Sequence, residues 1–423
     1  MIKLLIVADD FTGALDTGVQ FSKKGVQTLV TTNFDINFAD LESDIEVLAV
    51  DTETRHVDMK TAYDRVLRVV SNAIAYGVKY FYKKTDSTLR GNIGSELTAL
   101  LQACNAGQLS FIPAFPQINR ITENGCQIIN GIPLEQTDHA RDPFNPVTAS
   151  SIPGIIAQQS DINVRSVDRF SYKQAFANVN KQPEIVLFDA LSENDMLQIG
   201  KILQMENRLN VIAGCAGFAE MLLTFIPFKR RQMSVKKQGK TVLIISGSLN
   251  NVSIDQINYA QSQGIAGYTF NSEQKLDKQY MFSKNGEQLV REISNQLSID
   301  GHFIINMASK RYENEKDEAK EYAVRHGMPI ESINLQIAHN VGILVKKVLE
   351  AVKFDALVVF GGDTLLGIMD ILDCDGIAPS EELLPGVVVS SVVSSRYSFQ
   401  VVSKAGSFGE KDVVSGILSY LNS

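Results

Sequence analysis

The chain has 423 residues, of which 44% are hydrophobic and 21% are charged, and its formal net charge is −8. The length predicts two or three domains, and the composition is that of a globular protein, which excludes a disordered chain. The acidic balance disfavours nucleic acid as a partner. No apolar run approaches the roughly 18 residues of a membrane span, and none resembles a signal peptide. We therefore expect a soluble cytoplasmic protein without membrane contacts.

Short apolar runs alternate with amphipathic stretches along the first half of the chain. Strands are expected at 2–7, 46–50, 78–82, 109–112, 185–188 and 211–213, and helices at 14–24, 61–76 and 94–106. This alternation is typical of βαβ units, which build mostly parallel sheets.

Residues 229–240 interrupt this pattern with six cations in twelve residues and no apolar periodicity. We interpret the segment as a surface linker between a domain at 1–230 and another at 240–423, although a basic binding patch would have the same composition. Beyond it, strands are expected at 241–246, 303–306, 356–360 and 400–403, and helices at 253–263, 314–326, 334–352, 365–372 and from 411. The predicted fold class is α/β, with two domains that are each a mostly parallel sheet flanked by helices and an active site in the cleft between them.

Cysteine and histidine do not form a recognisable pattern. The four cysteines (Cys104, Cys126, Cys215 and Cys374) include no CxxC pair, and the five histidines are isolated. A disulfide framework or a zinc site is therefore not expected.

Three strands of the second domain are followed by segments rich in glycine and hydroxyl groups: Ser246–Ser248, Gly361–Thr364 and Lys404–Gly409. Ligands of parallel α/β sheets bind at the carboxyl ends of the strands. Glycines let the backbone approach a ligand, and the helix that follows offers unpaired N–H groups, so these segments could form a phosphate cradle. Tight turns without a ligand also favour glycine, so this alternative stays open.

Standard nucleotide motifs are missing. No G-x-G spacing occurs, which disfavours a dinucleotide-binding dehydrogenase, and no G-x-S-x-G motif occurs, which disfavours an α/β-hydrolase. Gly239-Lys240-Thr241 resembles the end of a Walker motif, but it precedes a strand and Ser234 replaces the first glycine.

The strand ends of the first domain are charged instead. Asp9 and Asp10 follow the first strand, 51–55 follows the second, and 83–92 follows the third with three cations, one acid and several hydroxyl or amide groups. Cations suit a carboxylate ligand, and acids suit hydroxyl groups, so these segments favour a hydroxylated acid as ligand. An N-cap acid and a solvated charged loop are the alternatives. A long polar stretch follows residue 116 and contains Arg120, Thr122, Asp138 and 141–143.

Five motifs together resemble the four-carbon acid sugar kinase family, in order and over essentially the whole chain. They are Ala8–Ala14 (ADDFTGA), Lys84–Asn92 (KTDSTLRGN), Pro113–Pro116 (PAFP), Gly361–Thr364 (GGDT) and Lys404–Gly409 (KAGSFG). Asn119-Arg120-Ile121 and Cys215-Ala216-Gly217 depart from the Gly-Arg-Thr and Ser-Ala-Gly that are usual in the family.

The resemblance implies a sugar-acid-binding domain, an ATP-binding domain and transfer of phosphate from ATP to the terminal hydroxyl of D-threonate, D-erythronate or a 3-oxo-tetronate. The segment 132–143 favours the first two substrates. The sugar acid would be held by Asp9, Asp10, Arg55, Lys83, Lys84, Thr85, Asp86, Ser87 and Arg90. ATP would be held by Ser248, Gly361, Gly362, Asp363, Thr364, Lys404 and Gly406.

For the mechanism, we expect Asp10 or Asp86 to accept or orient the attacking hydroxyl, and Asp363 to be the acid nearest to Mg²⁺. A sugar-acid-binding protein without catalysis is the alternative of another class. The sequence leaves the preferred acid and the oligomeric state open, with a homodimer among the options.

Overall fold

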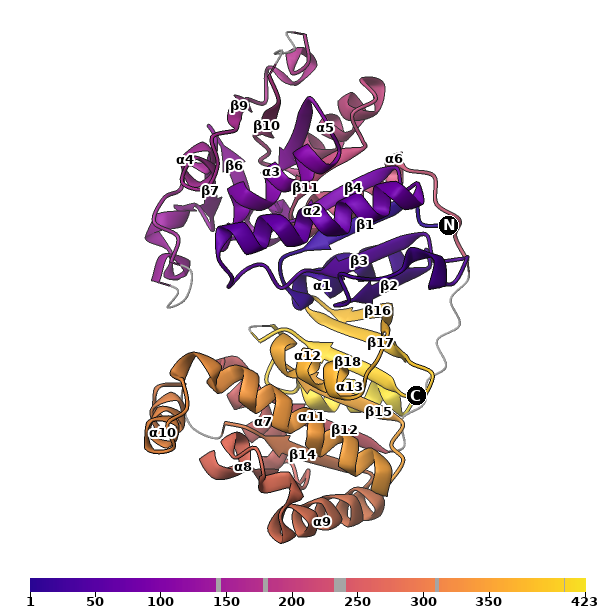
Figure 1. Ribbon diagram of the computed structural model, residues 1–423, viewed down its shortest axis with the longest axis vertical. Helices are drawn as coiled ribbons and strands as arrows, with labels where there is room; N and C mark the ends of the chain where they lie inside the picture. The colour runs from indigo at the N-terminus through magenta and orange to yellow at the C-terminus, as the bar shows by residue number, and fades with distance from the viewer. Residues whose placement is uncertain (142–145, 178–181, 232–240, 309–311, 407) are drawn as a thin grey trace. The chain divides into compact units, whose positions relative to one another are not determined.

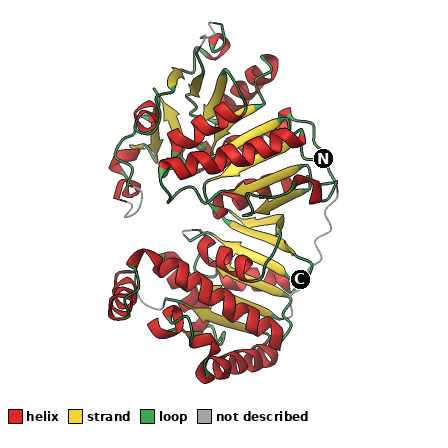
Figure 2. Cartoon of the chain, in the orientation of Figure 1, coloured by secondary structure: helices red, strands yellow, loops and turns green. Residues whose placement is uncertain are grey.

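The chain folds into two compact units, an N-terminal unit (Met1–Gln232) and a C-terminal unit (Met233–Ser423). The computed structural model describes residues 1–141, 146–177, 182–231, 241–308, 312–406 and 408–423 (Figures 1 and 2). Most of the predicted linker at 229–240, and Ser407 of the last glycine-rich motif, lie outside the described residues.

The N-terminal unit is built around a parallel sheet with the strand order β2-β3-β1-β4-β11-β5-β10-β9. The strands are β1 (Leu4–Ala8), β2 (Thr28–Thr31), β3 (Val47–Asp51), β4 (Tyr80–Lys84), β5 (Gln108–Ile112), β9 (Asn163–Val167), β10 (Glu184–Phe188) and β11 (Val211–Gly214). Every residue of β1, β3, β5 and β10 is buried, as expected for strands that are covered on both faces. Of these strands, β2 and β9 were not expected from the sequence.

Helices cover both faces of this sheet. They are α1 (Phe11–Ser22), α2 (Met59–Tyr76), α3 (Ile93–Ala103), α4 (Ile152–Ala157), α5 (Glu193–Met205) and α6 (Ala216–Phe225). Successive side chains of a strand point to opposite faces. Lys83 reaches Glu96 on α3, while Lys84 lies next to Gly13 on α1, so α3 and α1 lie on opposite faces.

A small antiparallel sheet forms in the stretch that was expected to be a polar loop. Its strands are β6 (Arg120–Glu123), β7 (Cys126–Ile129) and β8 (Ile132–Pro133). Both connections are Asn-Gly pairs with positive φ, at Asn124-Gly125 (51° and 71°) and Asn130-Gly131 (51° and 77°). Positive φ at two successive residues is the geometry of a tight β-hairpin turn, and asparagine followed by glycine adopts it most readily. The sequence therefore carries a hairpin signal that the strand pattern alone does not reveal.

The C-terminal unit has the strand order β13-β14-β12-β15-β18-β17-β16, in which β17 is antiparallel to both of its neighbours, β18 and β16. The strands are β12 (Val242–Ser246), β13 (Gly267–Thr269), β14 (His302–Asn306), β15 (Ala356–Phe360), β16 (Gly376–Leu384), β17 (Val387–Val393) and β18 (Gln400–Lys404). The hairpin β16–β17 was missed from the sequence, but the expectation of a mostly parallel sheet is confirmed.

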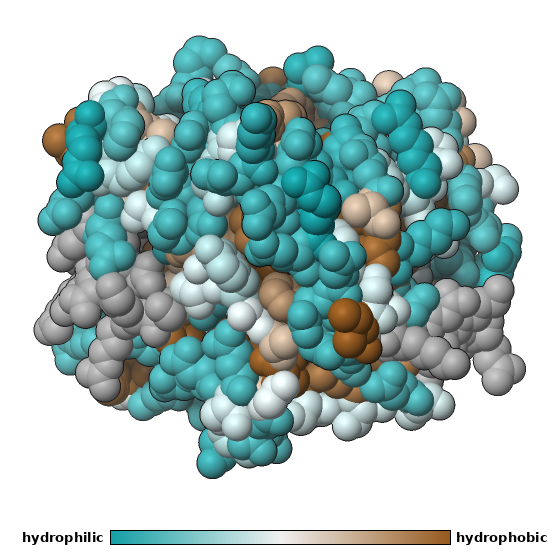
Figure 3. Space-filling model, turned by 90° about the horizontal axis from the view of Figure 1, so that it is seen from below, coloured by the Kyte–Doolittle hydropathy of each residue, from teal (hydrophilic) through white to brown (hydrophobic). Residues whose placement is uncertain are grey.

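The helices of this unit are α7 (Asn251–Ser262), α8 (Ser272–Leu276), α9 (Lys284–Asp300), α10 (Tyr312–Arg325), α11 (Ile333–Ala351), α12 (Gly362–Ile371) and α13 (Val413–Leu421). α7 and α13 pack on one face of the sheet around a core that includes Ile244, Ile257, Val358 and Val414. The face in Figure 3 is mainly hydrophilic, with small groups of hydrophobic residues. Among the described residues, no helix is long and apolar enough to cross a membrane.

Candidate functional site

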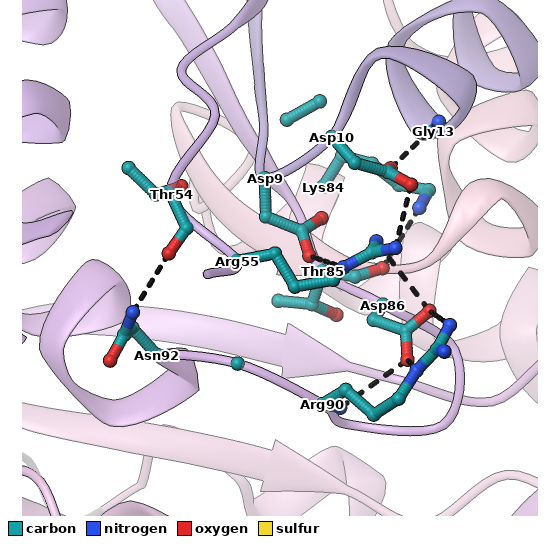
Figure 4. A network of polar contacts seen from close by, with 12 residues as sticks. Asp9, Asp10, Gly13, Thr54, Arg55, Lys84, Thr85, Asp86, Arg90 and Asn92 are labelled. Atoms are coloured by element: carbon teal, nitrogen blue, oxygen red, sulfur yellow. Dashed lines mark hydrogen bonds and ion pairs between the residues drawn. The ribbon is translucent and has the colours of Figure 1, made fainter. Parts of the chain in front are cut away.

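The charged segments of the N-terminal unit follow three adjacent strands. β1 lies between β3 and β4, and its last residue, Ala8, is level with Asp51 and with Lys84. The residues that follow these strands therefore meet at the carboxyl edge of the sheet. Asp9, Arg55 and Asp86, which are far apart in the sequence, come together there (Figure 4).

Arg55 is the centre of this group of charges. Its Nε donates to Asp9 Oδ2 at 2.8 Å, its Nη1 donates to Asp10 Oδ2 at 2.6 Å, and its Nη2 lies 3.6 Å from Asp86 Oδ1. On the other side, Arg90 holds Asp86 with two hydrogen bonds, from Nε at 2.8 Å and from Nη2 at 3.1 Å. One guanidinium thus fixes three carboxylates (Figure 4).

These contacts keep the buried acids ionised. Burial alone would raise the pKa of Asp86, but Arg55 and Arg90 hold that pKa well below its usual range. Burial likewise opposes ionisation of Asp9, and the charges of Arg55, Lys83 and Lys84 outweigh it, so the pKa of Asp9 is lowered. The edge of the sheet therefore carries fixed negative charges at neutral pH.

Polar atoms of this site remain available for a ligand. Asp9 Oδ1 and Thr85 Oγ1 are buried and have no hydrogen-bond partner in the described part of the chain. Because a buried polar atom without a partner is costly, both atoms favour a ligand or a water molecule at this position. Asp10 is more accessible, with 29% of its side chain exposed, and its Oδ1 accepts from Gly13 N at 2.8 Å, which caps α1.

The two consecutive lysines point to opposite faces of the sheet. Lys83 is fully buried, with Nζ at 3.3 Å from Glu96 Oε2 and donating to Lys84 O at 3.0 Å. Lys84 Nζ donates to Thr85 O at 2.9 Å, on the side of α1 where Asp10 lies. The side chain of Lys84 thus lies next to Asp10, while that of Lys83 pairs with Glu96 on the opposite face, and the charges of both lysines act on Asp9. Ser87 receives a hydrogen bond from Arg120 on β6, a residue that was not among the expected ligands.

In the C-terminal unit, the three glycine-rich segments also follow adjacent strands. β15 lies between β12 and β18, with Ser246 level with Phe360 and Phe360 level with Lys404. Thus the segments that begin at Gly247, Gly361 and Ala405 start side by side at one edge of the sheet.

Glycines allow these segments to approach one another closely. A Cβ at Gly247 would lie 1.8 Å from Thr364 Oγ1, and a Cβ at Gly406 would lie 3.1 Å from Ser248 Oγ. Gly361 precedes α12 with φ of 112°, a conformation that other residues rarely adopt. Gly362 begins α12, and Asp363 is exposed in its first turn. The three segments therefore approach one another at the N-terminus of α12, an arrangement that suits an anionic group.

Lys404 is the last residue of β18 and is buried where these segments meet. The residue is 1% exposed, and its Nζ donates to Gly406 O at 3.0 Å and to Ser253 Oγ at 3.1 Å. No carboxylate within the described residues pairs with it, and burial lowers its pKa to about 8.

Two further polar groups lie at this edge. Ser246, which begins the first glycine-rich segment but was not among the residues expected to hold ATP, and Asn306, which was missed from the sequence, are level with each other in the pairing of β12 with β14. Ser246 Oγ and Asn306 Nδ2 are buried without a hydrogen-bond partner among the described residues. Each is the last residue of a strand, which is the signal that could have identified them. The described residues contain no group of three or more His, Cys, Asp or Glu that could hold a metal ion.

Comparison with known proteins agrees with this division into two sites. Residues 4–222 match the family model of a sugar-binding N-terminal domain, and residues 243–414 match that of a nucleotide-binding C-terminal domain. The chain belongs to the four-carbon acid sugar kinase family.

Curated relatives span its full length. A D-threonate kinase of Salmonella typhimurium is 28% identical over 99% of this chain and 98% of that protein. A D-erythronate kinase of Heliobacterium modesticaldum is 26% identical over 100% of this chain and 97% of that protein. Among solved structures, a Salmonella typhimurium protein has a TM-score of 0.80 at 18% identity, over 97% of this chain and 98% of its own. This last likeness shows the fold.

Substitution of Arg55 tests the organisation of the N-terminal site. We expect Arg55→Met to lower the free energy of unfolding by about 3 kcal/mol at pH 7, because it leaves buried carboxylates without their partner. Asp9 and Asp86 each have a lower pKa in the folded protein than in the unfolded chain, where the pKa of aspartate is near 4. Their ionised forms therefore stabilise the fold at pH values above about 4. This contribution is lost as the pH falls through the folded values, so the deficit of the variant should shrink below about pH 4.

Denaturant titrations of both proteins between pH 3 and 7 measure this difference. The matched control is Arg68→Met, because the ion pair of Arg68 with Asp35 is largely exposed, and it should cost less than about 1 kcal/mol. Equal losses in the two variants would contradict the central role of Arg55.

Proposed function

We propose that the chain is an ATP-dependent kinase that phosphorylates the terminal C4 hydroxyl of D-threonate or D-erythronate. The observation that carries this proposal is the pair of strand-end sites. One combines fixed carboxylates with guanidinium groups, and the other combines glycines, hydroxyls and a helix N-terminus. The names of the full-length relatives support the substrate class, and 3-oxo-tetronate kinases match at lower identity, from 22% to 24% over most of the chain.

The N-terminal site suits a hydroxylated acid. Arg90 and Lys84 provide positive charge, and Asp9 Oδ1 and Thr85 Oγ1 are buried polar atoms that hydroxyl groups could satisfy. Both acids accept hydrogen bonds through both oxygens, but Asp10 is the more exposed carboxylate, while Asp86 is buried and has a lowered pKa. Of the two acids expected to accept the attacking hydroxyl, we therefore assign this role to Asp10, and we assign Asp86 to the positioning of the guanidinium groups.

The C-terminal site suits the phosphates of ATP. Ser248 lies next to Gly406 and Gly361, and Gly361 directly precedes α12, so backbone and hydroxyl groups of three segments lie close together at a helix N-terminus. Mg²⁺ commonly binds through one or two carboxylates and the phosphates themselves. Asp363, exposed in the first turn of α12, fits this pattern and would contribute to holding the ion, which neutralises phosphate charge.

A coupled assay of ADP release tests the proposed activity directly. We expect ATP consumption with D-threonate or D-erythronate and none with L-threonate, followed by mass-spectrometric detection of a 4-phosphate. Preference for a 3-oxo-tetronate would reassign the substrate. Binding of the acids without ATP turnover would instead support the alternative of a non-catalytic sugar-acid-binding protein.

The assignment of Asp10 predicts different kinetic effects for two neighbouring acids. Asp10→Asn should lower kcat by about 100-fold, because the hydroxyl loses its acceptor. Asp86→Asn should mainly raise the KM for the sugar acid, because Arg90 and the Nη2 group of Arg55 would no longer be held in position by a carboxylate. Asp64→Asn, an exposed control on α2, should change neither constant. Wild-type kcat in Asp10→Asn would contradict the assignment of Asp10, and a loss of kcat at unchanged KM in Asp86→Asn would contradict the positioning role of Asp86.

The environment of Lys404 predicts that ATP binding depends on pH. With a pKa of about 8 in the free protein, Lys404 loses its proton in mildly alkaline solution, while bound phosphate favours the protonated form. The dissociation constant for ATP should therefore increase above pH 8, by up to about tenfold per pH unit. Calorimetric titrations from pH 7 to 9.5 measure this slope, and Lys404→Arg should flatten it. An equal slope in wild type and Lys404→Arg would contradict the role of Lys404.

A further inference from the structure

Arg120 is a cation of the N-terminal site that the proposed mechanism has not yet used. Its guanidinium donates to Ser87 Oγ and forms no ion pair with a carboxylate of the described residues. It is close enough to Asp86 and Arg90 for their charges to act on it, and burial is the main cause that lowers its pKa. Arginine nevertheless stays protonated at neutral pH, so a half-buried positive charge remains without an anionic partner.

The backbone around Arg120 holds this charge in a fixed position. Arg120 N donates to Phe115 O at 3.1 Å, and Phe115 N donates to Arg120 O at 2.6 Å. The turn between them passes through Asn119 with φ of 54°, and Arg120 pairs with Ile129 in the β6–β7 hairpin. Because the backbone is held in this way and the guanidinium already contacts Ser87, less freedom would be lost when the side chain binds a ligand.

The same hairpin contacts the loop after β4 through a second hydrogen bond. Gln127 Nε2 donates to Ser87 O at 3.3 Å, and Gln127 Oε1 accepts from Thr122 Oγ1 at 3.1 Å. Ser87 is thus held through its hydroxyl by Arg120 and through its carbonyl by Gln127. The small sheet therefore belongs to the site, and its cation is aligned with the residues that follow β4.

The charges of the site are ordered from acidic to basic. Asp9 and Asp10 lie at the end of β1, and Arg55 joins them to Asp86. Beyond Asp86 come Arg90 and Arg120, next to the small sheet. A four-carbon sugar acid has a matching order, with a hydroxyl at C4 and a carboxylate at C1.

We propose that Arg120 binds the C1 carboxylate of the substrate and thereby orients the C4 hydroxyl towards Asp10. This inference rests on the proposed function and deepens it, because it makes Arg120 the residue that selects an acid over an uncharged four-carbon polyol or amide. A planar guanidinium can bind a carboxylate with two parallel hydrogen bonds, which suits this role better than a lysine would.

A purely structural role for Arg120, in which it only ties down Ser87, makes a different prediction. A structural residue would affect all ligands of the site alike, whether or not they carry a charge. If Arg120 instead binds the substrate carboxylate, its substitution would weaken binding of the acid and leave binding of the uncharged amide unchanged. The comparison of D-threonate with D-threonamide therefore separates the two roles.

The experiment measures kcat/KM and the calorimetric dissociation constant for D-threonate and D-threonamide in wild type, Arg120→Met and Arg120→Lys. For D-threonate, we expect Arg120→Met to lower kcat/KM and to raise the dissociation constant by about 10- to 100-fold each, the range of a charge-assisted hydrogen bond. For D-threonamide, both constants should stay within about twofold of the wild-type values. Arg120→Lys keeps the charge without the planar fork, so it should recover part of the loss. Arg68→Met, whose ion pair with Asp35 is exposed on α2, should match wild type with both ligands.

Equal weakening of acid and amide, or unchanged binding of D-threonate, would overturn the assignment of Arg120. If Arg120→Met does not fold, Arg120→Lys and Ser87→Ala apply the same comparison, with selective loss of the acid expected in each. Failure of the proposed function is distinguishable, because it would appear as no turnover of any four-carbon acid in the wild type. The calorimetric comparison of acid and amide would still test Arg120 in that case.

Discussion

The N-terminal site depends on the interaction of Arg55 with the carboxylates around it. Asp9 is almost completely buried, and a buried carboxylate is costly unless a cation and hydrogen bonds compensate for it. Arg55 compensates by holding Asp9 and Asp10 through separate nitrogens and by approaching Asp86. The loops after β1, β3 and β4 are thereby tied together without closing the site, because Asp9 Oδ1 keeps an unused acceptor position.

The two proposed sites are built in different ways. The N-terminal one consists of side-chain charges, so its attraction for an acid would depend on cations that its own carboxylates do not fully engage. The C-terminal one consists mainly of backbone groups at a helix N-terminus, with Lys404 buried at the end of β18. Both lie at the carboxyl edge of a parallel sheet, where loops from adjacent strands converge. In this proposal, a chain with a net charge of −8 binds two anions through groups that are concentrated at these edges.

The position of both candidate sites could be predicted from the sequence, because ligands of parallel sheets bind where the strands end. Asp9, Arg55, Asp86, Ser248 and Gly361 all follow predicted strands, and the strand order places their loops next to one another. A position after a strand does not indicate which face a side chain takes, so Lys83 was grouped with Lys84 although it pairs with Glu96 on the opposite face. Nor does it point to Arg120, which lies on a short antiparallel strand.

The sequence by itself determined the alternation of strands and helices, the residues at the strand ends and the family, because these depend on local patterns and on motifs within short segments. Only the tertiary structure decided which charges meet. The pairing of Arg55 with Asp9 and the contact of Arg120 with Ser87 join residues that are 46 and 33 positions apart. Such contacts depend on strand order and on the position of the small sheet, which follow from packing of the whole unit rather than from any local pattern.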